Sequence, residues 1–111
     1  MDDFLNKSWL FDIYGNLLNE NQKKVYEYHI LEDLSFNEIA DELKKTRQDC
    51  HDLYTRADKK LVELDKKLRL KNKFLHIEDY AQKINKLSND KEIKALSNKI
   101  IKLIKTEGNN G

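Results

Sequence analysis

The chain has 111 residues with a formal net charge of +1, and 39% of its residues are hydrophobic against 37% charged. This length supports one core without disulfides or metals, and the single cysteine cannot form an internal disulfide. The apolar runs are too short to cross a membrane, and the first residues lack the pattern of a signal peptide. We therefore expect a cytoplasmic protein without membrane insertion, with one helical domain over residues 1–106 and a flexible tail over residues 107–111.

Charge is unevenly distributed along the chain. Residues 1–44 contain four lysines and ten acidic residues, a net charge of −6, whereas residues 45–76 contain ten basic and five acidic residues, a net charge of +5. Residues 77–111 contain seven lysines and five acidic residues, a net charge of +2. A polyanion should therefore meet the middle and end of the chain rather than its start. The alternative is that lysine-rich helices only keep the protein in solution.

Two helices are predicted before residue 35. Apolar residues at helical spacing indicate a first helix over residues 3–14, and Gly15 after it suits the left-handed position at a helix end. Asn19 followed by Gln22 is a capping-box pattern that opens the second helix. His29 falls at the edge of the apolar face of that helix, where we expect it to pack.

The spacing between the next two predicted helices indicates the type of fold. Ser35 with Glu38 forms a second capping box, and Thr46 is a cap for a long helix that continues to residue 68. A short helix, a tight break at residues 44–46 and a following helix are the arrangement of a helix-turn-helix, here at about residues 35–68. Small Ala40 allows the two helices to cross closely. Cys50 stands where a buried aliphatic residue is expected, so core packing is favoured over a reactive thiol.

The C-terminal part is also helical. After a charged stretch at residues 69–73, apolar residues repeat at helical spacing over residues 77–87, and Asn89 or Asp90 can start a further helix. The fold class is therefore all-α, a helix-turn-helix bundle of about five helices. These C-terminal amphipathic segments cannot bury their apolar stripes alone, so they either fold back onto the earlier helices or pair in a homodimer.

Several of these segments resemble known families. Four segments are similar to region four of bacterial sigma factors, which reads promoter DNA. They are Leu10 to Gly15, Leu18 to Gln22, Ser35 with Glu38-Ile39-Ala40, and Arg47-Gln48 before Asp52. More closely, the whole chain resembles the small YlxM family, which is typically encoded beside components of the signal recognition particle. The resemblance implies a regulatory or accessory protein of the signal recognition particle pathway, with that particle's RNA, its proteins or DNA as partners.

The turn departs from the sigma pattern. Lysines 44 and 45 replace the usual glycine and aliphatic residue, and a lysine in a left-handed conformation is strained. On the following helix, Arg47, Gln48, His51 and Thr55 could face a duplex, but Asp49 and Asp52 repel phosphates. These two aspartates weaken the hypothesis that the protein is a transcriptional regulator that reads a specific DNA sequence.

Basic residues farther along the long helix could instead follow the phosphates of a folded RNA by shape. The competing interpretation is a solvated face partly neutralised by Asp58, Glu63 and Asp65. The candidate nucleic-acid-binding residues are Arg47, Gln48, His51, Thr55, Arg56, Lys59, Lys60, Lys66 and Lys67.

No pattern in the sequence indicates catalysis. The three histidines lie far apart, none has a partner at a metal-ligand spacing, and no phosphate loop or nucleophile motif is present. We expect a non-enzymatic protein without metal or cofactor. A protein adaptor that uses the fold without nucleic acid is a further alternative.

Overall fold

A computed structural model of the chain describes residues 2–106, so the predicted tail at residues 107–111 lies outside the described residues. The all-α prediction is confirmed, although the described part contains six α-helices where the sequence predicts about five. In chain order the elements are α1 (Asp2–Tyr14), the 3-10 turn η1 (Gly15–Leu17), α2 (Glu20–Tyr26), the π-turn η2 (Glu27–Leu31), α3 (Phe36–Leu43), α4 (Arg47–Leu68), α5 (Leu70–Leu87) and α6 (Lys91–Thr106).

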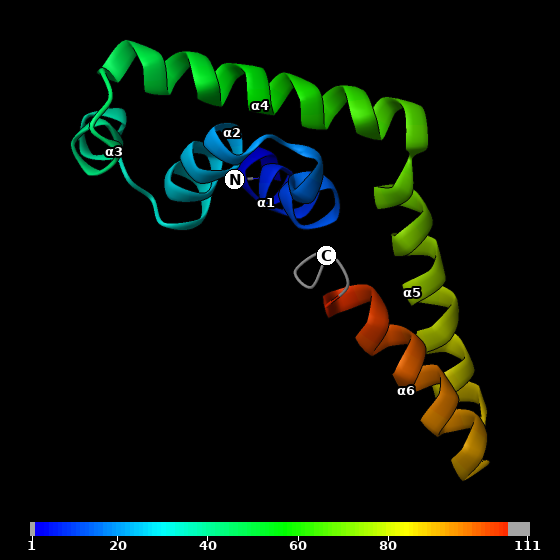
Figure 1. The fold of residues 1–111 in the computed structure, drawn as a ribbon. Helices are drawn as coiled ribbons and strands as arrows, with labels where there is room; N and C mark the ends of the chain where they lie inside the picture. The colour runs from blue at the N-terminus through cyan, green and yellow to red at the C-terminus, as the bar shows by residue number, and fades with distance from the viewer. Residues whose placement is uncertain (1, 107–111) are drawn as a thin grey trace.

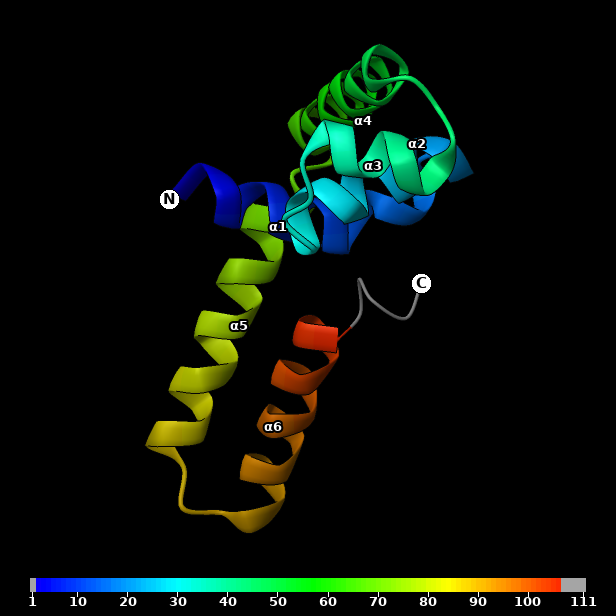
Figure 2. The same cartoon turned by 90° about the vertical axis from the view of Figure 1, so that its left-hand side faces the viewer.

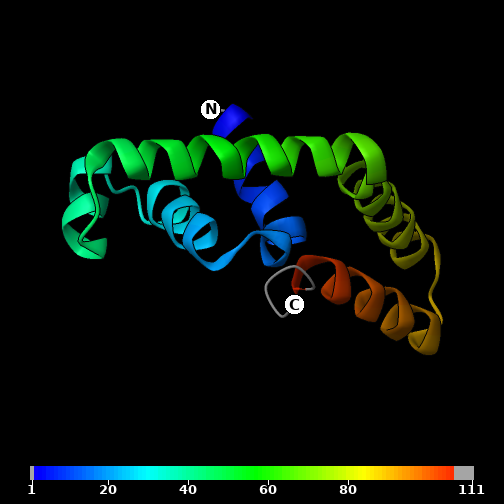
Figure 3. The same cartoon turned by 45° about the horizontal axis from the view of Figure 1, so that its top comes forward.

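The long helix α4 organises the molecule. Helices α1, α2 and α3 pack along one side of it, and the antiparallel pair α5 and α6 extends from its far end (Figures 1 and 3). The overall shape is elongated, with extents of 57 × 26 × 25 Å. We call residues 2–68 the body and residues 70–106 the hairpin; in Figure 2 the hairpin extends downward from the body.

The core lies in the body, in two clusters that meet at Tyr54 of α4. Tyr26 stacks between the rings of Phe11 and Tyr54, with ring centroids 5.4 and 5.3 Å apart. One cluster joins α1, α2, η2 and α4, and the other joins α2, α3 and α4. Their buried members are Leu10, Phe11, Tyr14, Leu18, Tyr26, Ile30, Ala57 and Leu61 in the first, and Val25, Ile39, Ala40 and Cys50 in the second.

The predicted helix starts are confirmed by their hydrogen bonds. The amide of Gln22 donates to the Asn19 side chain, and the amide of Glu38 donates to the Ser35 hydroxyl, each within a complete capping box. The Asp49 amide donates to the Thr46 hydroxyl at 3.0 Å. Of the two candidates before α6, Asp90 is the cap, because its carboxylate accepts from the amides of Glu92 and Ile93. Each cap satisfies amides that have no partner within the helix.

The expectation for Gly15 is wrong. It has no positive φ and begins the turn η1 instead of a left-handed helix end. Its role is spatial, because a Cβ atom at this position would lie only 3.1 Å from the ring of Phe11. Glycine here therefore allows close packing against α1, where a β-carbon would push the Phe11 ring by a few tenths of an ångström.

The charged stretch at residues 69–73 is almost entirely helical, and α5 begins at Leu70, earlier than the apolar spacing from residue 77 predicts. A single left-handed residue, Arg69 with φ 54°, forms the corner between α4 and α5. The corner is anchored by Tyr14 of α1, whose hydroxyl donates to Asp65 at 2.7 Å and accepts from the amide of Leu70 at 3.1 Å. Tertiary contacts thus hold a sharp bend that local sequence does not specify.

The hairpin is joined by small and polar side chains. Ala81 of α5 and Ser97 of α6 are its buried residues. The Asn85 amide group donates to Ser97 and Asn98, both at 2.9 Å, and the Lys94 amine donates back to the Asn85 carbonyl. Between α1 and the open end of the hairpin lies a cavity of about 320 Å³. No helix within residues 2–106 is long and apolar enough to cross a membrane.

Candidate nucleic-acid interface

The predicted helix-turn-helix consists of α3, a turn at residues 44–46, and α4. Lys44 ends α3 in the left-handed region with φ 56°, as its place in the motif predicts. The amide of Lys45 donates to the carbonyl of Ala40 at 3.0 Å, which closes the turn, and Thr46 then caps α4. The turn keeps the required conformation without glycine, at a cost of about 1 kcal/mol for a left-handed residue with a β-carbon.

Close packing beneath the turn fixes the direction of α4. Ala40 is only 9% exposed and lies in one cluster with Ile39, Val25 and the fully buried Cys50. Burial, and then the nearby Asp49 carboxylate, raise the pKa of the Cys50 thiol, which favours the neutral form. The core role predicted for Cys50 is confirmed, and its burial gives no access to a reactive thiolate.

The first turns of α4 are open to solvent. Arg47, Gln48, His51 and Thr55 are all exposed. The Gln48 amide group donates to Asp52 at 3.0 Å, and the Thr55 hydroxyl donates to the backbone carbonyl of His51 at 2.9 Å. The edge of the His51 ring contacts Phe36 of α3. Asp52 therefore holds the side chain that is best suited to reading an adenine edge.

The nine predicted binding residues do not form one patch. Gln48, Thr55, Lys59 and Lys66 share the side of α4 that faces away from the body, because they recur at helical spacing. Arg47 and His51 lie on one flank of this row, whereas Arg56, Lys60 and Lys67 lie on the other. At about 1.5 Å per residue, Lys66 is also roughly 28 Å from Arg47 along the helix.

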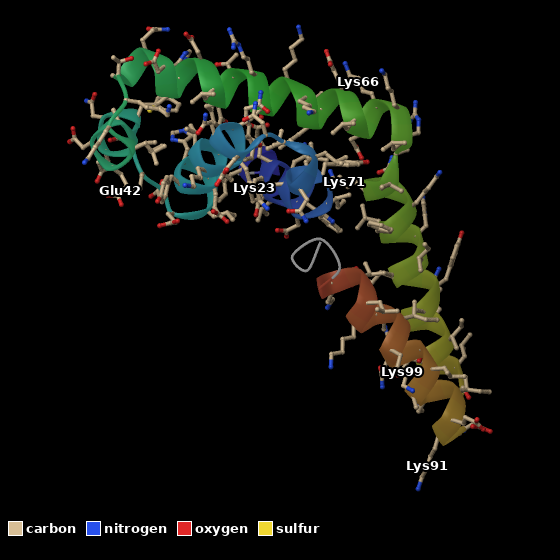
Figure 4. All side chains as sticks on the ribbon, viewed as in Figure 1. Lys23, Glu42, Lys66, Lys71, Lys91 and Lys99 are labelled. Atoms are coloured by element: carbon tan, nitrogen blue, oxygen red, sulfur yellow. The ribbon has the colours of Figure 1, made fainter. Side chains whose placement is uncertain are left out.

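We call the side of α4 that faces away from the body the outward side. It bears Gln48, Thr55, Lys59 and Lys66, with Arg56 and Lys67 beside them. Figure 4 shows Lys66 projecting from it, away from the body. Among the described residues, Arg47, Arg56, Lys59, Lys66 and Lys67 take part in none of the recorded salt bridges. Lys60 differs, because its amine donates to the carbonyl of Leu17 at 2.8 Å and so caps the turn η1.

Two of the three carboxylates expected to neutralise this side point elsewhere. Asp58 accepts from Lys7 at 3.0 Å and from the Tyr26 hydroxyl at 3.2 Å, and Asp65 accepts from Tyr14. Both carboxylates are therefore engaged with α1 and α2 on the body side of α4, and only Glu63 is exposed. The interpretation of a neutralised face is wrong for Asp58 and Asp65, so the outward side carries more net positive charge than the sequence suggests.

Burial alone would lower the pKa of the Lys7 amine, but the hydrogen bonds from Lys7 to Tyr54 and Asp58 outweigh it and raise that pKa. Lys7 thus stays charged and neutralises Asp58 from inside the body. This pairing could not be predicted from local spacing, because Lys7 and Asp58 are far apart along the chain.

Sequence reasoning also left Lys44 out of the candidate set. It is exposed immediately before α4, at the left-handed position of the turn. Its charge adds to that of Arg47 at the start of the helix. On α3, by contrast, Asp41 is exposed, as is Glu42, which Figure 4 labels. The negative charge of α3 disfavours a phosphate on that side, so a polyanion would meet α4 from its outward side.

The described residues contain no group of three or more histidine, cysteine or acidic side chains placed to hold a metal ion. His29 packs as expected, with its ring 4.4 Å from that of Phe36 and its Nδ1 atom 2.8 Å from the carbonyl oxygen of Leu34. His76 stacks near Tyr80 in α5, far from the helix-turn-helix in the chain.

Comparisons with known proteins agree with this architecture. The model of the UPF0122 family, described as "Putative helix-turn-helix protein, YlxM / p13 like", matches residues 1–104. A UPF0122 protein of Clostridium botulinum is 39% identical over 99 residues, which cover 89% of each chain. A UPF0122 protein of Shouchella clausii is 43% identical over 74 residues, covering 67% of this chain and 68% of its own. No solved structure is significantly similar to the chain.

Proposed function

Because this chain belongs to the UPF0122 family of YlxM- and p13-like helix-turn-helix proteins, we propose that it is a non-enzymatic, nucleic-acid-binding accessory protein. It would act in the cytoplasm in the signal recognition particle pathway, as the resemblance to the YlxM family implies. The outward side of α4 would contact the nucleic acid, and the RNA of the signal recognition particle is the favoured ligand.

The observation that carries this proposal is the separation of charge on α4. Asp58 and Asp65 are tied to α1 and α2, whereas Arg56, Lys59, Lys66 and Lys67 remain on the solvent side, where they outnumber the exposed Asp52 and Glu63. Lysines spread along a helix can follow phosphates by shape without reading base edges. The contact is therefore expected to be dominated by phosphates and to weaken as salt rises.

The test is binding of the purified full chain to three ligands in parallel. These are signal recognition particle RNA, an unrelated structured RNA and random duplex DNA, each at low and near-physiological salt. Selective retention of the first RNA at higher salt is the expected result. Equal and salt-sensitive binding to all three would reduce the signal to generic electrostatics, and absence of binding to all of them would contradict the proposal in favour of a protein adaptor.

Charge-reversal variants locate the contact. The double variant Lys59→Glu and Lys66→Glu should weaken binding and lower the slope of log affinity against log salt by about 0.7 to 0.9 for each lost phosphate contact. The matched control is Lys86→Glu with Lys91→Glu, which makes the same charge change on exposed positions of the hairpin; Lys91 is labelled in Figure 4. If both double variants lose affinity equally, net charge and not the outward side of α4 governs binding.

A second candidate is a DNA-binding transcriptional regulator. It is favoured by Arg47 and Gln48, which are exposed in the first turn of α4, the usual place of base contacts in a helix-turn-helix. Selection from a random duplex library distinguishes the candidates. A recurring motif that is lost in Arg47→Ala but kept in Lys66→Ala would support DNA reading, whereas no enrichment would reject it.

A further inference from the structure

The hairpin leaves two rows of large apolar side chains uncovered. On α5 they are Ile77, Tyr80, Ile84 and Leu87, which are 43%, 60%, 46% and 87% exposed. On α6 they are Ile93, Leu96, Ile100 and Leu103, which are 43%, 54%, 38% and 62% exposed. Both rows repeat after three, four and three residues, the spacing of an apolar seam between packed helices. We call the two rows together the apolar stripe.

The two rows lie on the same side of the hairpin. The helices touch along Ala81 and Ser97, and each row lies roughly a quarter turn from that line. When two right-handed helices pack antiparallel, residues that are rotated about each helix axis in the same sense from the contact line lie on the same side of the pair. The polar contacts between the helices occupy the opposite side, with Glu78 paired to Lys105 at 3.7 Å and Asn85 bonded to Asn98.

From this geometry we propose that the apolar stripe is the interface through which two copies of this chain pair. The two hairpins would form a four-helix bundle with an isologous two-fold interface. The exposed parts of the stripe amount to roughly 800 Å² per copy, about what each partner contributes to a stable interface of standard size.

Charge at the edges of the stripe suits a second copy. Glu92 and Lys99 flank the row on α6, and Lys83, which is paired with Asp79 at 3.2 Å, flanks the row on α5. Both signs are present on each copy, so two copies can approach without an uncompensated charge along the seam. An edge made only of lysines would favour binding to an anionic membrane, but the edge residues here carry both signs of charge.

The body leaves the stripe open, because even Leu103, which lies next to the α6 residues that face α1, is 62% exposed. The row on α5 begins at Ile77, about two helical turns beyond the corner at Arg69. The stripe belongs to the hairpin alone, and α4 takes no part in it. A pair formed in this way keeps two outward sides of α4 open to solvent.

The test is sedimentation velocity of the full chain from about 1 μM to about 200 μM, a range chosen for an interface of this size. The mass should rise with concentration from 13.2 kDa toward twice that value. The double variant Leu87→Lys and Leu103→Lys should remain a monomer throughout, because it places two charges within the seam. Both positions are more than half exposed in one copy, so the far-ultraviolet circular dichroism of the variant should match that of the parent.

The matched control is Gln82→Lys with Ala95→Lys, which adds the same charge at exposed positions away from the stripe. This control should still pair. A parent chain that stays at 13.2 kDa at every concentration would overturn the proposal, as would pairing that survives in both double variants. Vesicles with and without anionic lipid, added to a monomeric parent, would then show whether a membrane covers the stripe instead.

Discussion

The body and the hairpin are both built from helices, but they use their apolar side chains differently. In the body, α4 is covered by three other helices, and residues such as Tyr26, Ile39 and Leu61 are fully buried. In the hairpin, each helix has essentially one neighbour, and Ala81 and Ser97 are the buried residues. An amphipathic helix therefore becomes part of a core only when enough neighbours surround it, and a two-helix unit leaves part of its apolar surface for another partner.

The largest expected difference between the two parts comes from removing one leucine side chain from each. Leu61→Ala in the body should lower the free energy of unfolding by about 2–5 kcal/mol, because it opens a cavity in the core. Leu96→Ala in the hairpin should cost about 1 kcal/mol or less in the monomer, because Leu96 is already 54% exposed. Urea unfolding at low protein concentration measures both. Equal losses would show that the hairpin is as well buried as the body.

Enlarging a small side chain sharpens the same contrast. Ala40→Leu should destabilise the chain by about 1–3 kcal/mol and weaken nucleic-acid binding, since it forces α3 and α4 apart where Ala40 and Cys50 pack together. The control Ala95→Leu, at an exposed position of α6, should leave both properties unchanged. Thermal unfolding and the RNA-binding assay report the two effects. Full binding by Ala40→Leu would mean that the crossing of α3 and α4 does not position the contact surface.

Tyr14 connects the two parts, and its hydroxyl can be removed without changing the packing of its ring. Tyr14→Phe should cost about 1–3 kcal/mol, because the bonds to Asp65 and to the Leu70 amide are lost in a buried setting. The free energy of unfolding from urea titration gives this value. An unchanged stability would show that the corner at Arg69 holds itself without the anchor.

The same hydroxyl gives a pH dependence. Burial and the bond to Asp65 raise the pKa of Tyr14 from 10.0 to about 12. A pKa raised by folding stabilises the folded state fully below the unfolded value and loses that contribution as pH rises through the folded value. The parent should therefore lose stability more steeply than Tyr14→Phe between pH 10 and about 12. Parallel pH curves for the two proteins would contradict this assignment.

The smallest expected effect concerns the turn. Lys44→Gly removes the steric strain of a β-carbon in the left-handed conformation, but it increases the conformational entropy of the unfolded chain. The free energy of unfolding should therefore rise by about 1 kcal/mol or less. Lys44→Ala keeps the β-carbon and serves as the control, since it removes the same charge without relieving the strain. A higher melting temperature for the glycine variant than for the alanine variant is expected. The reverse order would mean that Lys44 is not strained.

The candidate site could be predicted only in part. Exposure of Arg47, Gln48 and the lysines of α4 followed from helical spacing, because positions that alternate with an apolar face must point outward. The engagement of Lys60 with Leu17 and the inward bonds of Asp58 could not be predicted, since their partners are far apart in the chain. Spacing along one helix says which side a residue is on but not what lies across from it.

The sequence by itself determined the helix starts at Asn19, Ser35 and Thr46 and the spacing of the helix-turn-helix, because caps and turns depend on interactions within a few residues. Only the tertiary structure decided that α4 turns into α5 at Arg69, that Gly15 makes room for Phe11, and that the hairpin keeps its apolar stripe exposed. Each of these depends on how many neighbours an apolar or charged side chain meets. That number is set by the path of the whole chain and not by local spacing.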